Sequence, residues 1–545
     1  MHLEHQSHGF TALGPMHQAF AKLTGLAALA IAMLLGAFAA LAFAPFHLSV
    51  ALLVSFTGLI WMIDGARGHR RWGRAIFGRG WAFGFGYFLV SMYWTAEPFL
   101  VEPEKHLVFI WMPLLLLPGG MALIWGAACA MAGTFWSQSP SRVFVFPVFM
   151  TFAELVRGHL FGGFPWNLAG TTWIPGGPLS QAASIGGVYW LTLVTIFVMG
   201  SIAAFVDLRD DNSMVNRVVP AVLSVVIVSA GWGWGAQRLQ TPLELTEQNI
   251  IMMDSGVPQA EKWEIGANEI FGQYVELMES VETVPGDLII WPEAALPVDL
   301  LQSPGSTEAV VSLLRDRKLI LGTRRYTTYQ YETPTYYNSL TVLDTNSARS
   351  TPLAVYDKHR LVPFGELAPV NFIPFGRSIS GILPSSMQRQ LRQGFEPGEL
   401  GPSAVYVDGL PPFVALICYE GLFPAIPRAV DPRAEWMVLI SNDAWFGEGL
   451  GPDQHAAQNR YRTIESGLPM VRVASRGQSG IIDGLGRLTV QALPVTTTRE
   501  GWEPALGRGA LPASRPPTLY YRYGLLAFWL TALSMLVLAF LNWRR

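Results

Sequence analysis

The sequence predicts a multi-span α-helical membrane domain joined to an α/β domain. Of its 545 residues, 51% are hydrophobic and only 14% are charged, which is too apolar for one ordinary water-soluble fold. Long apolar runs fill the first 236 residues, whereas strand-like and helix-like segments alternate between residues 237 and 519. The formal net charge is −3 and no long block of one sign occurs, so nothing favours a nucleic-acid partner.

The membrane domain is predicted from apolar runs that approach the ~20 residues needed to cross a bilayer. Seven candidate spans precede residue 237, and an eighth lies in a C-terminal segment. The eight runs cover 23–44, 48–64, 81–96, 107–135, 143–157, 181–206, 218–236 and 522–541. Glu154 and Arg157, at the end of the fifth run, are costly groups inside a bilayer. No cleavage context follows the first run, so we expect it to be an uncleaved anchor.

The distribution of charged residues predicts how these spans are oriented. The connection after the third run carries Glu97, Glu102 and Glu104. The connection after the second run is basic instead, with Arg67, Arg70, Arg71, Arg74 and Arg79. Lys and Arg accumulate on the cytoplasmic side of membrane proteins, so we expect the arginine loop to be cytoplasmic. Counting spans from that loop places the region 237–519 on the outer side of the membrane.

The region 237–519 is long enough for one α/β domain with a sizeable core. Apolar runs there indicate strands at 288–291, 319–326, 337–343, 354–358, 413–418, 436–441, 469–475 and 480–483. A helix is predicted over 306–317, and a second is predicted to be capped by Asp453 and to stop before Gly467. The alternation of strands and helices predicts a mixed or parallel sheet.

Three of these strands end on residues that can perform covalent chemistry. The strand at 288–291 is followed by Glu293, the strand at 354–358 ends on Lys358, and the strand at 413–418 ends on Cys418. A lone cysteine in an apolar run is more often a buried core residue. Cys129 lies in a predicted span, however, so Cys418 is the single thiol of the outer region. A carboxylate, an ammonium and a thiol together supply the base, the oxyanion stabiliser and the nucleophile of an acyl transfer.

The sequences around these residues resemble the Glu-Lys-Cys triad of the nitrilase superfamily. The matching motifs are WPEAALP around Glu293, YDKHRLVPFGE around Lys358 and ICYEGLFP around Cys418. The VPFGE segment, the SNDAWFG motif at 441–447 and the flanking apolar runs are similar, more narrowly, to the apolipoprotein N-acyltransferase family. This resemblance implies a nitrilase-like α-β-β-α sandwich for the α/β domain. The implied domains are a membrane domain at 1–236, a catalytic domain at 237–519 and a C-terminal transmembrane helix at 520–545.

The resemblance also implies an acyltransferase that needs no cofactor. A phospholipid would give its acyl chain to Cys418 as a thioester, and the amine of a lipoprotein's diacylglyceryl-cysteine would take it, in the last step of lipoprotein maturation. Glu293 would act as general base and then acid, and Lys358 would stabilise the oxyanion. The protein would be a monomer in a bacterial inner membrane, with its catalytic domain in the periplasm. A membrane-tethered nitrilase-like amidase and an inactive membrane scaffold remain alternatives.

Further residues match positions near the family's active site. They are Glu366, Glu420, Asn338, which would orient the lysine or the glutamate, and Trp263, which would stand at the entrance of the site. Tyr419, next to the nucleophile, would either line the acyl pocket or simply pack. Each also has a structural interpretation, because a loop glutamate is ordinarily solvated and a lone aromatic residue ordinarily packs. His359 and His455 lack the spacing of metal ligands, so no metal site is predicted. The long apolar loop at 361–385 is predicted to enter lipid or to cover an acyl chain, and packing on its own domain is the alternative.

Two segments depart from the family pattern. Asp254-Ser255-Gly256-Val257 stands where a Gln-Gly-Asn is expected. Ala474-Ser475-Arg476-Gly477-Gln478-Ser479 replaces a sequence of the Thr-Asn-Thr-Gly type. Neither segment contains a triad residue. Both could alter the preference for donor or acceptor, so the chemistry is a firmer prediction than the identity of the substrates.

Overall fold

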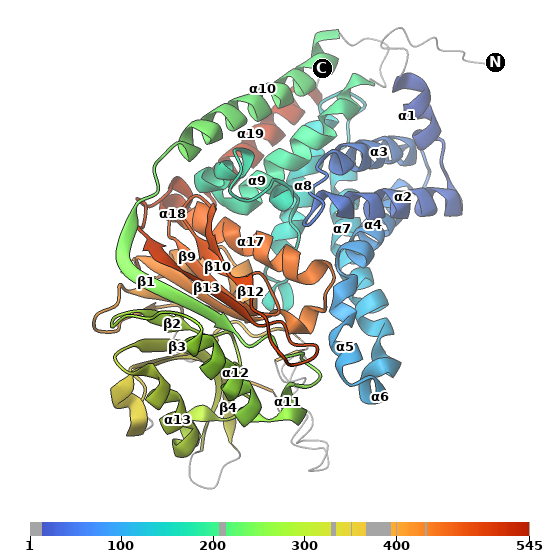
Figure 1. Cartoon of the computed structure of the whole chain (residues 1–545). Coiled ribbons are helices and arrows are strands. Elements are labelled where there is room, and N and C mark those ends of the chain that lie inside the picture. The colour runs from blue at the N-terminus through green and yellow to red at the C-terminus, as the bar shows by residue number, and fades with distance from the viewer. Residues whose placement is uncertain are drawn as a thin grey trace, which may run out of the picture. The chain divides into compact units, whose positions relative to one another are not determined.

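The computed structural model describes residues 13–206, 214–328, 334–349, 351–363, 365–366, 394–398, 401–430 and 433–543. The chain forms two compact units (Figure 1). The helical unit comprises residues 1–241, 449–457 and 518–545, and the α/β unit comprises residues 242–448 and 458–517. Of the predicted apolar loop at 361–385, residue 364 and residues 367–385 lie outside the described part of the chain.

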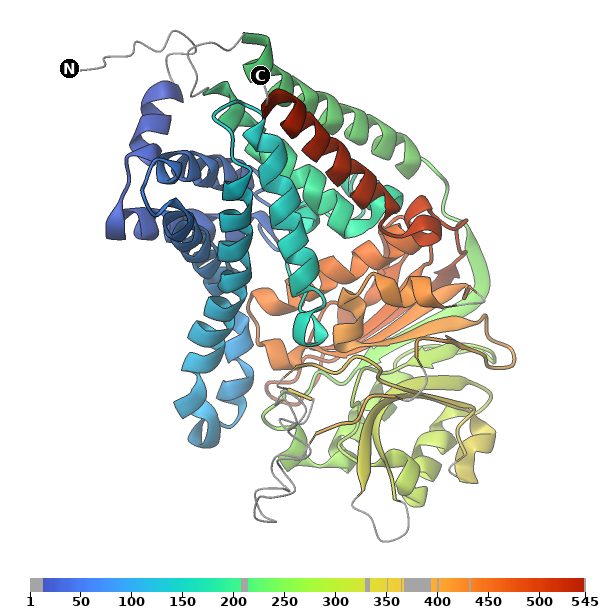
Figure 2. The same ribbon diagram turned by 180° about the vertical axis from the view of Figure 1, so that it is seen from behind.

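The helical unit is built from the apolar runs of both ends of the sequence. Its helices are α1 (Leu13–Ala21), α2 (Gly25–Ala39), α3 (Val50–Arg67), α4 (Trp72–Ser91), α5 (Pro98–Val101), α6 (Pro103–His106), α7 (Leu117–Thr134), α8 (Arg142–Arg157), α9 (Ala183–Gly200), α10 (Met214–Leu239), α18 (Leu519–Tyr523) and α19 (Leu526–Trp543). The C-terminal helix α19 lies against α8 and α9 (Figure 2). Segments far apart in the sequence therefore share one helical core.

Five helical stretches of the described chain are long and apolar enough to cross a membrane. They are Gly25–Ala42, Val50–Arg67, Pro103–Thr134, Leu179–Phe205 and Met214–Leu239, and Leu526–Leu541 is a shorter apolar helix. These stretches correspond to six of the eight predicted spans. The predicted spans at 81–96 and 143–157 overlap α4 and α8, which are less apolar because each carries charged residues. That these two helices cross the membrane stays a prediction.

Ion pairs provide partners for charged groups buried inside the helical unit. Arg157 pairs with Glu154 within α8, and Glu154 also accepts a hydrogen bond from the indole of Trp125 in α7. Arg142 Nε lies 2.8 Å from Asp64 Oδ1 of α3. All four charged side chains are buried. Because an unpaired charge is costly in apolar surroundings, this pairing explains how α8 accommodates Glu154 and Arg157.

The described strands of the α/β unit form two sheets. The first has seven strands in the order β12-β13-β1-β2-β3-β4-β5, and the second has six in the order β11-β10-β9-β8-β7-β6. The strands are β1 (Leu245–Asp254), β2 (Leu288–Ile290), β3 (Lys318–Thr327), β4 (Thr335–Leu343), β5 (Ala354–Asp357), β6 (Ala404–Val405), β7 (Phe413–Ile417), β8 (Trp436–Asn442), β9 (Met470–Ser475), β10 (Gly480–Ile482), β11 (Leu488–Gln491), β12 (Leu493–Pro494) and β13 (Ala505–Pro512). Strands β1 to β3 and strands β7 to β9 run parallel, and the outer strands pair antiparallel. The predicted mixed sheet is confirmed.

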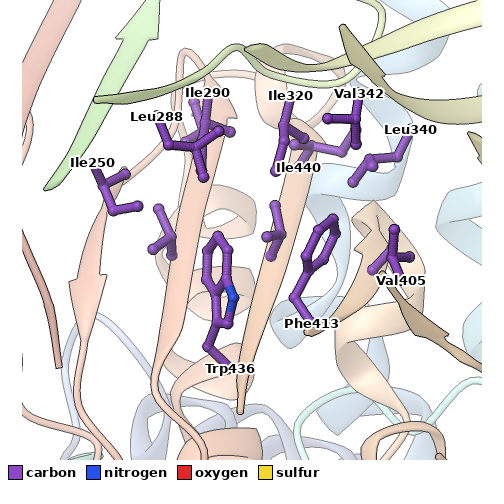
Figure 3. Packing of buried hydrophobic residues seen from close by; sticks show 14 of the residues in the cluster. Ile250, Leu288, Ile290, Ile320, Leu340, Val342, Val405, Phe413, Trp436 and Ile440 are labelled. Atoms are coloured by element: carbon purple, nitrogen blue, oxygen red, sulfur yellow. The ribbon is translucent and has the colours of Figure 1, made fainter. Parts of the chain in front are cut away.

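The two sheets pack face to face around a shared apolar core. Alternate residues of a strand point to opposite faces of its sheet. Ile250 and Met252 of β1 therefore face the inner core, where side chains of the two sheets point toward one another, among them Phe413 and Trp436 of the second sheet (Figure 3). Burial of such side chains is the main favourable term that holds the sheets together.

Helices cover the outer faces of both sheets. Residues of β1 that alternate with the inner ones, such as Ile251 and Met253, pack with α12 (Ala267–Glu279) and α13 (Pro304–Leu314) (Figure 1). On the other sheet, Arg472 of β9 donates a hydrogen bond of 2.9 Å to Asn459 of α17. The described part of the α/β unit also contains α11 (Lys262–Ile265), α16 (Ala425–Ala429) and the part of α17 (Leu450–Ser466) that begins at residue 458. The layer order is α-β-β-α, as the resemblance implied.

All eight predicted strands are present, with ends that differ by two residues at most. Two helix bounds need correction. The helix expected at 306–317 ends at Leu314, because Arg315 has a φ of 49°, outside the helical region. Helix α17 begins at Leu450, so Asp453 lies in its first turn and does not cap it. Among the described residues, five strands are additional to the predicted set, namely β1, β6, β11, β12 and β13.

Candidate active site

The three predicted triad residues lie just beyond strands of both sheets. Glu293 follows β2, Lys358 follows β5 and Cys418 follows β7. Lys358 Nζ lies 3.5 Å from Glu293 Oε1, and the thiol of Cys418 interacts electrostatically with both groups. Their exposed fractions are only 6%, 1% and 8%, respectively. The structure therefore brings the three residues into one buried cluster.

Both carboxylate oxygens of Glu293 accept hydrogen bonds. The side-chain amide of Asn338 donates to Oε1 at 2.6 Å, and the backbone N–H of Asn442 donates to Oε2 at 2.8 Å. These donors come from β4 of the first sheet and β8 of the second sheet. The carboxylate is thus fixed in orientation by groups from both layers.

A close approach of β3 fixes the backbone at Glu293. The N–H of Gly322 donates to the carbonyl of Pro292 at 3.1 Å, and the N–H of Ala295 donates to the carbonyl of Gly322 at 3.1 Å. A Cβ at position 322 would lie 2.4 Å from Glu293 Cα, closer than any real side chain can approach. Only glycine permits this contact, so Gly322 allows the backbone of Glu293 to lie close against β3.

Lys358 is held by a second carboxylate, that of Glu366. Lys358 Nζ donates to Glu366 Oε1 at 2.8 Å, and Glu366 also accepts hydrogen bonds from Asn338 Nδ2 and from the N–H of Val362, each at 2.8 Å. Burial alone would lower the pKa of Lys358, but the charges of Glu366 and Glu293 outweigh it and raise that pKa. The amine is therefore an ammonium at neutral pH, beside the thiol.

Glu420 joins the segment of Cys418 to the segment of Lys358. Its Oε1 accepts hydrogen bonds from the two N–H groups after Lys358, at 2.8 and 3.0 Å, and from the hydroxyl of Tyr356 at 2.9 Å. Its Oε2 accepts from the N–H of Ile417 at 2.9 Å. Burial raises the pKa of Glu420, and the hydrogen bonds oppose that rise. The carboxylate links the ends of β5 and β7, and in this way it sets the distance between ammonium and thiol.

The chain leaves β7 sharply at Cys418. Cys418 has a φ of 50°, a conformation that is uncommon for residues other than glycine. Burial raises the pKa of the Cys418 thiol, the charge of Glu293 adds to the rise, and the charge of Lys358 opposes it. The thiol also forms a hydrogen bond with Ser441. At neutral pH the resting group is a thiol that needs a base to become a nucleophile.

The two aromatic residues of the predicted set differ in their placement. Tyr419 is buried, and its ring contacts that of Phe423 edge to face with centroids 5.1 Å apart. Trp263 is 56% exposed, and the guanidinium of Arg324 lies 5.8 Å from its ring centroid. The structure places Tyr419 next to the nucleophile and leaves Trp263 outside the buried cluster.

The two histidines considered as metal ligands have other contacts. The backbone N–H of His359 donates to Glu420, and the ring of His455 stacks on Trp166 with centroids 5.7 Å apart. Among the residues that the structure describes, no group of three or more His, Cys, Asp or Glu side chains could hold a metal ion.

Residues outside the predicted set also build the site. Asn442 holds Glu293 through its N–H and donates from Nδ2 to Gln259 Oε1 at 2.8 Å. Lys262 is buried, and this burial lowers its pKa to about 8 against the opposing charges of Asp254 and Glu293. The available signal for Asn442 is its place in the SNDAWFG motif, at the end of the buried strand β8. For Lys262, in a short helix of mixed polarity, the sequence offers no comparable signal.

The two segments that depart from the family pattern contact each other. Asp254 accepts hydrogen bonds from the N–H of Arg476 at 2.8 Å and from the hydroxyl of Ser475 at 3.1 Å. The guanidinium of Arg476 donates to the carbonyl of Gly256 at 3.1 Å. The two segments that differ from the family pattern are therefore joined by hydrogen bonds between the ends of β1 and β9.

Comparison with known proteins places this chain in a family. Residues 35–201 match the family model "Apolipoprotein N-acyltransferase N-terminal domain", and residues 256–498 match the model "Carbon-nitrogen hydrolase". The chain is 35% identical to the apolipoprotein N-acyltransferase of Caulobacter vibrioides, over 84% of this chain and 85% of that relative. It is 34% identical to that of Rhodopseudomonas palustris, over 93% of this chain and 94% of the relative. A nitrilase-superfamily amidase from Nesterenkonia AN1 aligns with 51% of this chain and 94% of its own, at 14% identity and a TM-score of 0.33. By the identity and coverage of the two relatives, the chain belongs to the apolipoprotein N-acyltransferase family.

Proposed function

We propose that this protein moves a fatty acyl chain from a membrane phospholipid, through a thioester on Cys418, to the N-terminal amine of diacylglyceryl-cysteine in an apolipoprotein. The observation that carries the proposal is the buried cluster of Glu293, Lys358 and Cys418 at three strand ends. Membership of the family supports the acceptor, and the apolar helices support a donor drawn from a lipid bilayer.

The first half of the reaction acylates Cys418. Glu293 takes the thiol proton, the sulfur attacks the ester carbonyl of the donor, and a C–S bond forms. The ammonium of Lys358 stabilises the negative charge that develops on the carbonyl oxygen. When the ester C–O bond breaks, Glu293 returns its proton to the departing lysophospholipid oxygen. A thioester and a neutral lysophospholipid hydroxyl remain.

The second half transfers the acyl chain to the acceptor. The lipoprotein amine attacks the thioester carbonyl, and Lys358 again stabilises the oxyanion. Glu293 accepts the proton that the amine loses as the amide C–N bond forms. The C–S bond then breaks, and the proton on Glu293 returns to the sulfur. Every proton taken up by Glu293 is given back within the same half-reaction, so one carboxylate serves both halves.

The helical unit holds the reaction at the surface where both substrates are anchored. In this proposal the arginine loop at 67–79 is cytoplasmic and the region 237–519 lies in the periplasm of a bacterial inner membrane, as the charge distribution predicts. We include a monomeric enzyme in the proposal, since one chain supplies all three triad residues.

The test uses purified full-length protein in phospholipid vesicles labelled in the acyl chains. The acceptor is a synthetic peptide with an N-terminal diacylglyceryl-cysteine, and the matched control is the same peptide with an acetylated amine. We expect label on the free-amine peptide alone, in amide linkage. Release of ammonia from a water-soluble amide, without transfer of label to either peptide, would overturn the proposal and favour the membrane-tethered amidase.

A further inference from the structure

A chain of buried polar side chains leads away from the nucleophile. The hydroxyl of Ser441 donates to Asp443 Oδ1 at 2.6 Å, and Arg472 donates to Asp443 Oδ2 at 2.6 Å. Arg472 Nε also donates to Asn459 Oδ1 of α17 at 2.9 Å. All four side chains are almost fully buried. Burial of such groups costs free energy unless they are hydrogen-bonded, so breaking any of these contacts would destabilise the folded protein.

The pairing of the strands places Ser441 beside Cys418. Strands β7 and β8 are parallel neighbours, and Ile417 of β7 is the register partner of Ile440 of β8. The residues that follow, Cys418 and Ser441, therefore stand at the same level at the ends of adjacent strands. The hydrogen bond between the thiol and the Ser441 hydroxyl agrees with this register.

The Ser441 hydroxyl has one proton and two neighbours that can accept it. A serine oxygen can accept a hydrogen bond while its own O–H donates elsewhere. With a neutral thiol, the O–H points to Asp443 and the serine oxygen can accept the S–H. A thiolate has no proton to give and needs a donor. A rotation of the hydroxyl about Cβ–Oγ supplies that donor without breaking a covalent bond, while Asp443 keeps its contact with Arg472.

We propose that Ser441 is a positioning residue for Cys418, whose hydroxyl turns from Asp443 to the sulfur each time the thiolate forms, and that the Asp443–Arg472 pair holds it ready for this turn. The inference rests on the proposed role of Cys418 as the nucleophile. It applies at two moments, because sulfur carries negative charge when it attacks the donor and again when it leaves the thioester. Ser441 acts on the sulfur, whereas Lys358 acts on the carbonyl oxygen.

The charged groups around the thiol give the sign of the expected effect. Burial, Glu293 and Asp443 raise the pKa of Cys418, whereas Lys358 and the Ser441 hydroxyl lower it. Removal of the hydroxyl leaves the opposing charges in place. The pKa of the thiol is therefore expected to rise in Ser441→Ala.

The test measures how the alkylation rate of Cys418 by iodoacetamide depends on pH. Full-length protein in detergent carries Cys129→Ala, which leaves one thiol, and the variant adds Ser441→Ala. A hydrogen bond to a charged group is strong enough that we expect the midpoint of the alkylation profile to rise by about one pH unit or more. The pH profile of single-turnover thioester formation is expected to shift in the same direction, with a loss of about tenfold at pH 7.

Ser339→Ala is the matched control. Ser339 is fully buried and donates to Asp357 Oδ1 at 2.6 Å, and Asp357 pairs with Arg325. The first sheet thus holds a second Ser-Asp-Arg arrangement, with its serine and aspartate on the paired strands β4 and β5, whereas Ser441 lies on β8, next to the strand that leads to Cys418. We expect Ser339→Ala to keep the alkylation midpoint of the parent protein.

An unshifted midpoint in Ser441→Ala, or an equal shift in Ser339→Ala, would overturn the inference. Failure of the proposed function looks different. In that case the parent protein would take no acyl chain from phospholipid, although Cys418 would still be alkylated with the same dependence on Ser441.

Discussion

Two buried lysines lie near Glu293, and their surroundings move their pKa values in opposite directions. Burial alone would lower the pKa of Lys358, but Glu366 and Glu293 raise it. Burial lowers the pKa of Lys262 to about 8, although the charges of Asp254 and Glu293 oppose the change. Lys358 has a carboxylate at 2.8 Å, and this close partner is the physical reason for its opposite shift.

The lowered pKa of Lys262 predicts a pH-dependent cost in stability. An unfolded lysine has a pKa of about 10.4. Between pH 8 and 10 the unfolded chain holds a proton that the native chain lacks, so the free energy of unfolding rises with pH. Below pH 8 the buried ammonium costs on the order of 3 kcal/mol. Lys262→Met should therefore raise the unfolding temperature at pH 7, and by less at pH 10.

Thermal unfolding of the full chain in detergent at both pH values measures this difference. Lys318→Met is the control, because that lysine is only partly buried and begins β3. A stabilisation by Lys262→Met that is the same at pH 7 and pH 10 would contradict the predicted role of the charge.

The proposed base is tested by Glu293→Gln, which keeps the size of the side chain and removes its ability to take a proton. Because the thiol has a raised pKa, acylation without the base should slow by about a hundredfold or more. Single-turnover formation of the thioester gives the rate. Glu276→Gln on the surface of α12, where Glu276 pairs with Arg499, should keep the normal rate. Near-normal acylation by Glu293→Gln would assign the proton transfer to another group.

At the scale of elements, the contact between β3 and the turn after β2 positions the base. Gly322→Ala would place a Cβ 2.4 Å from Glu293 Cα, so the turn must shift. Such overpacking costs about 1–3 kcal/mol, and the displaced carboxylate should lower acylation at least tenfold. Gly305→Ala is the matched control in α13, where an added Cβ meets nothing within 4 Å. Equal activity of the two variants would show that the depth of Glu293 does not matter.

The strands that the sequence predicts are those whose own residues form a recognisable apolar run. Parallel central strands are buried on both faces, so β7 and β8 read as continuous apolar runs. Strand β13, with the sequence ALGRGALP, has no such pattern and forms because it pairs with β1, more than 200 residues earlier in the chain. Pairing between distant segments is not encoded in local periodicity, which is why β13 and its neighbour β12 escape prediction.

The same division holds for the active site. Glu293, Lys358 and Cys418 are predictable because each lies at or within three residues of the end of an apolar strand and in a recognisable motif. The surroundings of Ser441 and Lys262, by contrast, are supplied only by the folded chain. Ser441 lies beside the thiol because of the register of β7 with β8, and Lys262 is buried near Glu293 only in the folded chain.

At the scale of the whole molecule, the orientation in the membrane decides whether the chemistry can meet its substrates. Gly73 is the second residue of α4, which begins within the arginine-rich segment 67–79, for which the sequence predicts a loop, and Ser312 is exposed on α13 of the α/β unit. In a background without Cys129 and Cys418, Ser312→Cys should react with a membrane-impermeant thiol reagent in intact spheroplasts, whereas Gly73→Cys should react only after lysis. The reverse pattern would place the triad in the cytoplasm and favour an amidase that faces that compartment.

The central claim is that Cys418 carries the acyl chain, and the most direct measurement looks for that chain on the residue. Purified protein is incubated with phospholipid in the absence of an acceptor, digested and analysed by mass spectrometry, with and without neutral hydroxylamine. We predict a fatty acyl group on the Cys418 peptide that hydroxylamine removes, that persists in Cys129→Ala and that is absent in Cys418→Ser, whose hydroxyl is far harder to ionise than a thiol. An acyl group on another residue, or acyl transfer by Cys418→Ser at a substantial fraction of the normal rate, would contradict the account.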